Sequence, residues 1–183
     1  MTTSFDLIVV GAGAVGSAAA YHAAKAGQRV LLLEQFEVNH QNGSSYGASR
    51  IIRYAYDHPA YIALAKAVYP MWLDFQEEAG EQLFVQTGGL DFGSPDEPSL
   101  RETARSLEVS NIAFEQLTAA DAQRRFRQFQ FADEMQVIYQ PDSGILKASK
   151  CVLAHVRLAQ RYGATVLDNA PVTNIHVFDD SVE

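Results

Sequence analysis

The stretch Phe5–Glu34, "FDLIVVGAGAVGSAAAYHAAKAGQRVLLLE", decides the fold of this chain. Its apolar, β-branched beginning is typical of a strand that is buried on both faces. An alanine-rich helical pattern follows and ends at Gly27, and a second apolar run closes on Glu34. This order predicts a strand, a helix and a second strand, which is the unit that opens a Rossmann-like α/β fold.

The first strand and the helix are joined by a G-x-G-x-x-G pattern, formed by Gly11, Gly13 and Gly16. The first glycine permits a sharp turn, the second lets a pyrophosphate approach the backbone, and the third permits close packing of the helix on the strand. The pyrophosphate is expected at the amino end of the helix, where N–H groups and the helix dipole favour an anion.

Glu34 ends the second strand, where a carboxylate can accept hydrogen bonds from both hydroxyls of a ribose. The same carboxylate would repel a 2′-phosphate, which argues against NADP. The segment therefore predicts a site for FAD or NAD. A βαβ unit that binds no nucleotide is the alternative that the glycine pattern alone leaves open.

Composition excludes several other classes of function. The formal net charge of −8 over 183 residues disfavours a nucleic-acid partner. A single cysteine, Cys151, permits no internal disulfide, and the five histidines lack the spacing of metal ligands, so no metal site is predicted. No apolar stretch reaches the length of a membrane span, and we expect a cytoplasmic protein without a membrane partner.

The rest of the chain alternates between helical and extended patterns. Helices are predicted over residues 60–78, 96–108, 118–127 and 149–162, with Thr118 and Ser149 as N-caps. Strands are predicted on either side of Gly88 and Gly89 and over residues 134–140, 164–168 and 172–178. In the first of these helices the residues expected to face the core are Tyr61, Leu64, Ala65, Val68, Trp72 and Phe75.

The end of the chain predicts a hairpin that lacks most of its second strand. Residues 172–178 alternate, "DD" at residues 179–180 is a turn signal, and "SVE" begins a returning strand. An incomplete hairpin would leave an open edge, so we expect a longer full-length product. A frayed natural terminus is the alternative.

Four segments together resemble the monomeric sarcosine oxidase family, which includes N-methyltryptophan oxidase and belongs to the D-amino-acid-oxidase-like FAD enzymes. They are "DLIVVGAGAVGSAAAYHAA", "NGSSYGASRIIRYAY", "TGGLDFG" and "QPDSGIL". The resemblance covers about the N-terminal half of such an enzyme. It implies an α/β fold with a Rossmann-like FAD-binding domain in two pieces, residues 1–82 and 143–183. Residues 83–142 would form part of an inserted, strand-rich substrate domain.

The segment "GSSYGASRIIR", Gly43–Arg53, is the most discriminating part of this resemblance. The family implies that it runs beside the flavin ring, that Ile51 and Ile52 pack inside, and that Arg50 lies near the flavin face. Arg53 would receive the carboxylate of the substrate. On a helical turn the two arginines would lie on one side, and buried arginines need anionic partners. Structural ion pairs with Asp57 or Glu34 are the alternative.

The catalytic residues that the resemblance implies are Arg50, Arg53 and Tyr46. Tyr46 stands where family members often carry histidine, and Ala48 and Ser49 replace an aspartate and a threonine, so flavin tuning and substrate identity are open. Cys151 is not expected to attach the flavin, because the family's cysteine lies in the other half. The predicted cofactor-binding residues are Gly11, Ala12, Gly13, Val15, Gly16, Glu34, Gln35, Ser44, Ser49, Arg50, Ile51 and Val172, the last through its backbone.

The resemblance implies oxidation of a secondary amine, or of an N-alkyl or cyclic amino acid, to an imine while O₂ is reduced to H₂O₂. The partners would be a small-molecule substrate and O₂, and the enzyme would be a monomer. An NAD-dependent dehydrogenase explains the glycines but not the long non-periodic segment "SSYGASRIIRYAYDHPAY". A catalytically inactive dinucleotide-binding fragment is the other alternative.

Overall fold

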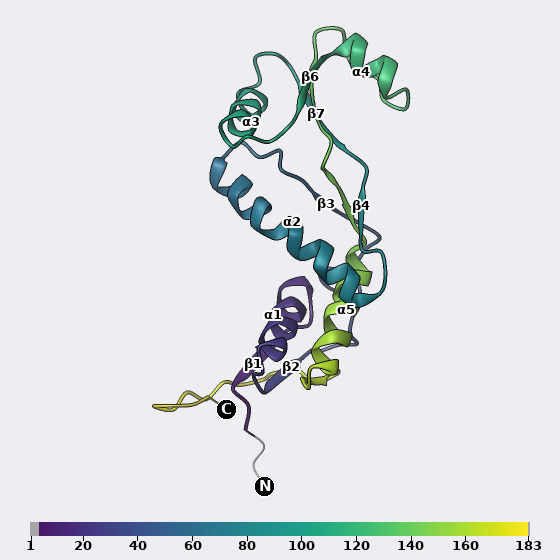
Figure 1. Ribbon diagram of the computed structural model, residues 1–183. Helices are drawn as coiled ribbons and strands as arrows, with labels where there is room; N and C mark the ends of the chain where they lie inside the picture. Colours follow the sequence, from purple (N-terminus) through teal and green to yellow (C-terminus); the bar gives the residue numbers. More distant parts are fainter. Residues whose placement is uncertain (1–3, 183) are drawn as a thin grey trace. The chain divides into compact units, whose positions relative to one another are not determined.

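A computed structural model describes residues 4–182 of the chain (Figure 1). These residues form two compact units. The first contains residues 4–49 and 147–182, and the second is Arg50–Leu146. The boundaries between the compact units are Ser49/Arg50 and Leu146/Lys147. The expected boundaries between the FAD-binding and substrate domains, at residues 82 and 142, stay a prediction.

The first unit is built on a parallel sheet of three strands. They are β1 (Leu7–Val10), β2 (Val30–Leu33) and β9 (Thr165–Leu167), in the order β1-β2-β9. The central strand β2 alternates between fully and partly buried residues, and Val30 and Leu32 have almost no exposed surface. The strand, helix and strand predicted from the opening stretch are thereby confirmed, and so is the strand predicted over residues 164–168.

Two helices of the first unit pack against each other: α1 (Ala14–Lys25) and α5 (Ala148–Arg161) (Figure 1). The buried ring of Tyr21 lies 5.6 Å from that of His155, measured between centroids. Helix α1 ends as predicted, because Gly27 follows with a positive φ of 86° and donates its N–H to the carbonyl of Ala24.

The expectation that the first strand is buried on both faces is wrong for this structure. Leu7 and Ile8 are 38% and 37% exposed, and Val10 is 59% exposed. Strand β1 pairs only with β2, so it stands at an edge of the sheet among the described strands. Its sequence has the composition of a central strand, and its position gives it the exposure of an edge strand.

The predicted cap of the last helix is also wrong. Helix α5 begins one residue earlier than expected, with Lys147 as the N-cap and no side-chain cap bond. Ser149 instead contacts the loop after β2, at Gly47. Its N–H donates to the carbonyl of Gly47 and its hydroxyl accepts the N–H of Gly47, both at 3.1 Å. The serine therefore fastens the loop to the helix, a long-range role that the local pattern does not reveal.

The second unit contains two antiparallel sheets of three strands. The first comprises β3 (Arg50–Ile52), β8 (Gly144–Leu146) and β4 (Phe84–Gln86), in that order. The second comprises β5 (Gly89–Gly93), β7 (Gln136–Gln140) and β6 (Glu115–Thr118), in that order. The predicted strands around Gly88 and Gly89 are confirmed, but they belong to different sheets.

Three helices accompany these sheets: α2 (Pro59–Ala79), α3 (Pro98–Val109) and α4 (Ala119–Arg125). All three lie where helical periodicity predicted them. The predicted cap of α4 is confirmed, because the Thr118 hydroxyl accepts the N–H of Asp121 at 3.1 Å. Pro59 begins α2 at a position where its missing N–H is tolerated.

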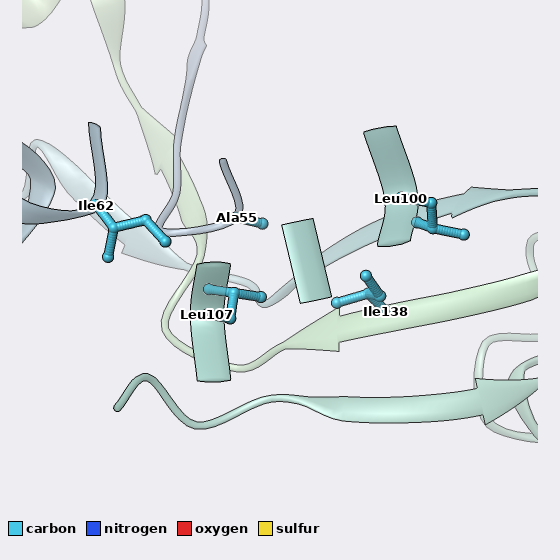
Figure 2. Close-up of a cluster of buried hydrophobic side chains, with 5 residues drawn as sticks. All are labelled: Ala55, Ile62, Leu100, Leu107 and Ile138. Atoms are coloured by element: carbon cyan, nitrogen blue, oxygen red, sulfur yellow. The ribbon is translucent and has the colours of Figure 1, made fainter. Parts of the chain in front are cut away.

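A cluster of buried apolar side chains forms a core of the second unit (Figure 2). It joins Ala55 of the segment after β3, Ile62 of α2, Leu100 and Leu107 of α3, and Ile138 of β7. These residues come from distant parts of the sequence, so the cluster ties α2 and α3 to the second sheet. Burial of a leucine or isoleucine side chain stabilises a fold by roughly 1.5–3 kcal/mol.

The buried face of α2 matches the predicted one only in part, because Phe75 is buried as expected and other predicted core residues are not. Ile62, Tyr69 and Phe75 are buried, whereas three residues expected in the core are exposed: Tyr61, Leu64 and Val68. These three line a groove of about 280 Å³ together with Trp72, which is partly buried. Helix α2 is apolar around much of its circumference, so periodicity alone could not decide which side would meet the core.

The strand predicted over residues 172–178 is not formed. Val172 is 38% exposed and lies outside any strand, and the end of the described chain makes a single antiparallel bridge between Val177 and Val182. Phe178 donates its N–H to the carbonyl of Ser181 at 2.9 Å, which confirms the turn at "DD". A two-stranded ribbon with exposed side chains has too little burial to extend further. Glu183, predicted in the returning strand, lies outside the described residues.

Candidate functional site

The glycine-rich turn is closely packed at the end of β1. Gly11 has a φ of +96°, which side-chain-bearing residues rarely adopt, and donates its N–H to the carbonyl of Leu33 at 2.7 Å. A Cβ added at Gly16 would lie 1.9 Å from the carbonyl oxygen of Gly11. Glycine is therefore required at both positions, at the first by conformation and at the second by space.

The amino end of α1 carries no cap from its own side chains, because the N-cap residue is Gly13. The Ser45 hydroxyl, from the loop after β2, accepts the N–H of Ala14 at 2.9 Å, and a Cβ added at Gly13 would lie 2.9 Å from the same oxygen. Ser45 thus lies where the anion was expected. Sequence reasoning chose its neighbour Ser44, which is exposed, and missed Ser45.

Glu34 links the end of β2 to the glycine-rich turn. Its carboxylate is buried, with 4% of the residue exposed, and accepts the N–H of Ala12 at 2.8 Å and that of Phe36 at 3.1 Å. The Nε2 atom of His40 lies 3.3 Å from Oε1. His40 is a second residue that sequence reasoning missed, since nothing in the local pattern associates it with Glu34.

The loop after β2 closes over the turn and leaves a small cavity of about 40 Å³. Its lining includes four residues of interest: Ala12, Gly13, Ser45 and Tyr46. This volume is of the size that one or two water molecules occupy, so the cavity itself does not hold a dinucleotide. The surrounding groups nevertheless suit one, because a small-residue turn, a helix amino end and a buried carboxylate lie side by side.

Other residues of the predicted set occupy the rim of this region. Val15 is 85% exposed on the first turn of α1, and Gln35 and Ser49 are exposed. Tyr46 is 42% exposed on the loop after β2, with its hydroxyl oxygen 3.4 Å from the side-chain nitrogen of Gln41. The first unit thus brings Gly11–Gly16, Glu34 and the loop together, while Val172 follows β9.

Arg50, Ile51 and Arg53 belong to the second unit, and they do not form the helical turn that was expected. Residues Arg50–Ile52 are strand β3, because each of them pairs with a residue of β8. Successive side chains of a strand point to opposite faces, so Ile51 is 74% exposed while Ile52 is buried. The expectation that both isoleucines pack inside is therefore wrong for Ile51.

Arg53 follows β3 and forms an ion pair with Asp91 of β5, with 2.7 Å between Nη1 and Oδ1. The two side chains are 38% and 28% exposed, and the guanidinium lies 5.0 Å from the centroid of the Tyr56 ring. Burial raises the pKa of the Asp91 carboxyl, and the nearby Arg53 guanidinium counteracts part of the rise. A structural ion pair was the alternative for this arginine, but Asp91 was not among its expected partners.

Residues 4–182 hold no group of three His, Cys, Asp or Glu side chains able to bind a metal ion. No helix in the same range combines the length and apolar character needed to cross a lipid bilayer. Cys151 is buried on α5 as predicted.

Comparison with known proteins places this architecture among flavoproteins. Residues 6–182 match the family described as FAD dependent oxidoreductase. The monomeric sarcosine oxidase of Bacillus sp. strain NS-129 is 35% identical over 184 residues, which cover 100% of this chain and 48% of that protein. The N-methyl-L-tryptophan oxidase of Citrobacter koseri is 34% identical over 97% of this chain and 48% of that protein.

A solved structure gives the same picture of the fold. NikD, described as an unusual amino acid oxidase essential for nikkomycin biosynthesis, aligns with a TM-score of 0.89 and 31% identity. The alignment covers 99% of this chain and 47% of NikD. The chain therefore spans about half the length of the relatives it matches. The predicted α/β fold, the family and its cofactor FAD are confirmed, and the NAD-dependent alternative is set aside.

Proposed function

The chain belongs to the FAD-dependent oxidoreductase family, and we propose that it forms part of an enzyme that oxidises a secondary amine. The substrate class includes N-alkyl and cyclic amino acids. The carbon next to nitrogen loses a hydride equivalent and the nitrogen a proton, which gives an imine that water hydrolyses. O₂ takes up the two electrons and two protons as H₂O₂. FAD, when bound, accepts the hydride equivalent and passes the electrons to O₂.

The single observation that carries this proposal is the buried Glu34 carboxylate held against the glycine-rich turn. In that position its remaining lone pairs would accept the hydroxyls of the adenosine ribose. The linking phosphates would lie at the amino end of α1, against Gly13 and the N–H groups of the first turn. Ser45 would hold one of these phosphates or yield the Ala14 N–H to it.

The remaining proposed contacts come from the segment that leads into β3. Ser44 and Tyr46 would border the cofactor from the loop, and Arg50 would supply positive charge near the ring where negative charge develops. Tyr46 can donate a hydrogen bond through its hydroxyl. Its proposed place in the reaction is therefore orientation. The names of the two relatives support an N-methylated amine as substrate.

An absorption spectrum of the purified protein tests the cofactor. We expect flavin bands that co-purify with the protein, and a spectrum taken after acid precipitation tells whether the flavin stays attached. A peroxide assay with N-methylated amines then tests the reaction. Colourless, folded protein that takes up no added FAD would contradict the proposal.

Dinucleotide binding without turnover is the alternative to this function. A dinucleotide-binding polypeptide without turnover would bind FAD and produce no peroxide from any amine. The two functions separate when the polypeptide is assayed alone and then together with the remaining half of such an oxidase. The monomeric state and the cytoplasmic location belong to the proposal, the latter supported by the single reduced, buried Cys151.

A further inference from the structure

Arg53 holds a carboxylate that belongs to the chain itself. The ion pair with Asp91 joins the end of β3 to the middle of β5 across 38 positions of sequence, with 2.7 Å between the charged atoms. Neither side chain is fully exposed, so solvent screens the pair less than it would at an open surface. The arginine therefore does not present a full positive charge to a ligand.

This pairing changes what Arg53 can bind. A carboxylate that approached the guanidinium would be attracted by Arg53 and repelled by Asp91 at a similar distance, so the two effects would largely cancel. The Asp91 oxygen also takes one of the N–H donors that a carboxylate would need for a two-point contact. A ligand without an anionic group is not repelled by Asp91 and does not need the N–H donor that Asp91 occupies.

The surroundings of Arg53 are aromatic. The guanidinium lies over the Tyr56 ring at 5.0 Å, and both residues line the groove of about 280 Å³ that also contains Tyr61 and Trp72. Aromatic walls of this kind suit an apolar or aromatic substituent, and they attract an ammonium group by cation–π interaction. A neutral ion pair beside aromatic rings is thus matched to an amine and not to an amino-acid anion.

Building on the proposed oxidation of secondary amines, we propose that Asp91 sets the substrate class by neutralising Arg53. The enzyme then prefers N-alkyl amines with an apolar or aromatic substituent and no carboxylate. Asp91 is a specificity-determining residue in this assignment, and it acts through Arg53.

The test compares two substrates that differ only in the carboxylate, N-methylbenzylamine and N-methylphenylglycine. We expect the flavin-loaded enzyme to show a higher kcat/KM for N-methylbenzylamine. The D91N substitution releases Arg53, and we expect it to shift the ratio of the two kcat/KM values toward N-methylphenylglycine by about tenfold or more. The shift should come mainly from KM of the carboxylate substrate, because binding changes and the chemical step does not.

Two control variants test whether the change in the ratio depends on the negative charge at position 91. Asp91→Glu keeps the negative charge and should keep the preference of the unaltered enzyme. Asp96→Asn removes an exposed carboxylate that pairs with Arg101, and it should leave the ratio unchanged. The inference is overturned if the unaltered enzyme prefers N-methylphenylglycine, or if D91N leaves the ratio in place.

A binding measurement gives a result without turnover. The side-chain ¹⁵Nε resonance of Arg53 is followed while phenylacetate, or its amide as a control, is added to the 183-residue chain. We expect saturable shifts with phenylacetate in D91N and at least about tenfold weaker binding in the unaltered chain. Equal phenylacetate affinities would overturn the role of Asp91. Absence of amine oxidation in every variant, with this binding difference intact, would contradict only the proposed function.

Discussion

At the scale of single residues, a few positions in the first unit allow almost no substitution. Gly16 is the clearest case, because the Cβ atom of any other residue would overlap the backbone carbonyl oxygen of Gly11. Glu34 is restricted for a different reason, since it is a buried carboxylate whose oxygens accept N–H groups of the chain. Both residues belong to the proposed dinucleotide site.

Gly16→Ala is expected to destabilise the first unit strongly. The new Cβ would lie 1.9 Å from the Gly11 oxygen, and a backbone atom cannot move aside as a flexible side chain can. We expect a loss of about 3 kcal/mol or more in the free energy of unfolding, measured by urea titration. Gly43→Ala is the control, because its Cβ would meet only His40 at 3.5 Å. Equal stability of the two variants would contradict the proposed packing.

Glu34→Gln is expected to weaken FAD binding. The amide keeps the size of the side chain but places an NH₂ donor where an oxygen now accepts an N–H or would accept a ribose hydroxyl. A hydrogen bond to a charged group contributes about 1.5–3 kcal/mol, and its loss weakens the free energy of FAD binding by that amount. We therefore expect the Kd for FAD to rise at least about tenfold. Glu37→Gln, at an exposed position on the same loop, should leave the Kd unchanged.

At the scale of elements, the packing of α1 against α5 places a titratable group out of water. His155 is 6% exposed and lies on the inner face of α5 beside Tyr21. Burial lowers the pKa of His155 from 6.5 to about 4, and the neighbouring His22 contributes in the same direction. The neutral imidazole is therefore the form that the folded helix pair accommodates.

The helix pair should consequently lose stability in mild acid. Between the ordinary pKa of 6.5 and the folded value of about 4, the unfolded chain binds more protons at His155 than the folded one. The free energy of unfolding should fall as pH is lowered through this window, by up to about 3 kcal/mol, and level off below it. Urea titrations from pH 7.5 to pH 4 would measure the difference between the unaltered chain and His155→Gln.

His176→Gln is the control for this profile, since His176 is exposed near the end of the described chain. Its profile should follow that of the unaltered chain throughout. Carboxylates titrate in the same range in all three proteins, so only the difference between profiles reports on His155. A His155→Gln profile that falls as steeply as the others would show that this histidine is not responsible.

At the scale of the whole molecule, the chain passes between the two units twice, at Ser49/Arg50 and at Leu146/Lys147. The two passages are bonded to each other within each unit. Gly47 and Ser149 exchange hydrogen bonds in the first unit, and Arg50 pairs with Leu146 in the second. This double attachment limits how far one unit can unfold while the other remains intact.

We therefore expect FAD bound by the first unit to stabilise the second one as well. FAD at a hundredfold excess over its Kd should add about 2.7 kcal/mol to the free energy of unfolding. The only tryptophan, Trp72, lies on α2 and reports on the second unit through its fluorescence. Its unfolding midpoint in urea should rise with FAD, and Ser149→Ala should reduce that rise. A midpoint unaffected by FAD would mean that the units unfold independently.

The sequence by itself determined the features that depend on neighbouring residues. Gly11 and Gly16 predict the turn, Gly27 predicts the end of α1, and Thr118 predicts the start of α4. These features are local because the hydrogen bonds of caps and turns are formed between residues only a few positions apart. The proposed dinucleotide site rests on the sequence for the same reason, since its glycines, helix end and acidic residue lie within one βαβ unit.

Only the tertiary structure decided which distant segments meet. The sequence predicts a helical turn that holds Arg50 and Arg53, but pairing with β8 makes Arg50–Ile52 a strand, and Asp91 becomes the partner of Arg53. The exposure of Val10 likewise follows from the edge position of β1 and not from its apolar sequence. Strand pairing and ion pairs depend on groups far apart in the chain, and no local pattern records which of the many possible partners will be nearest.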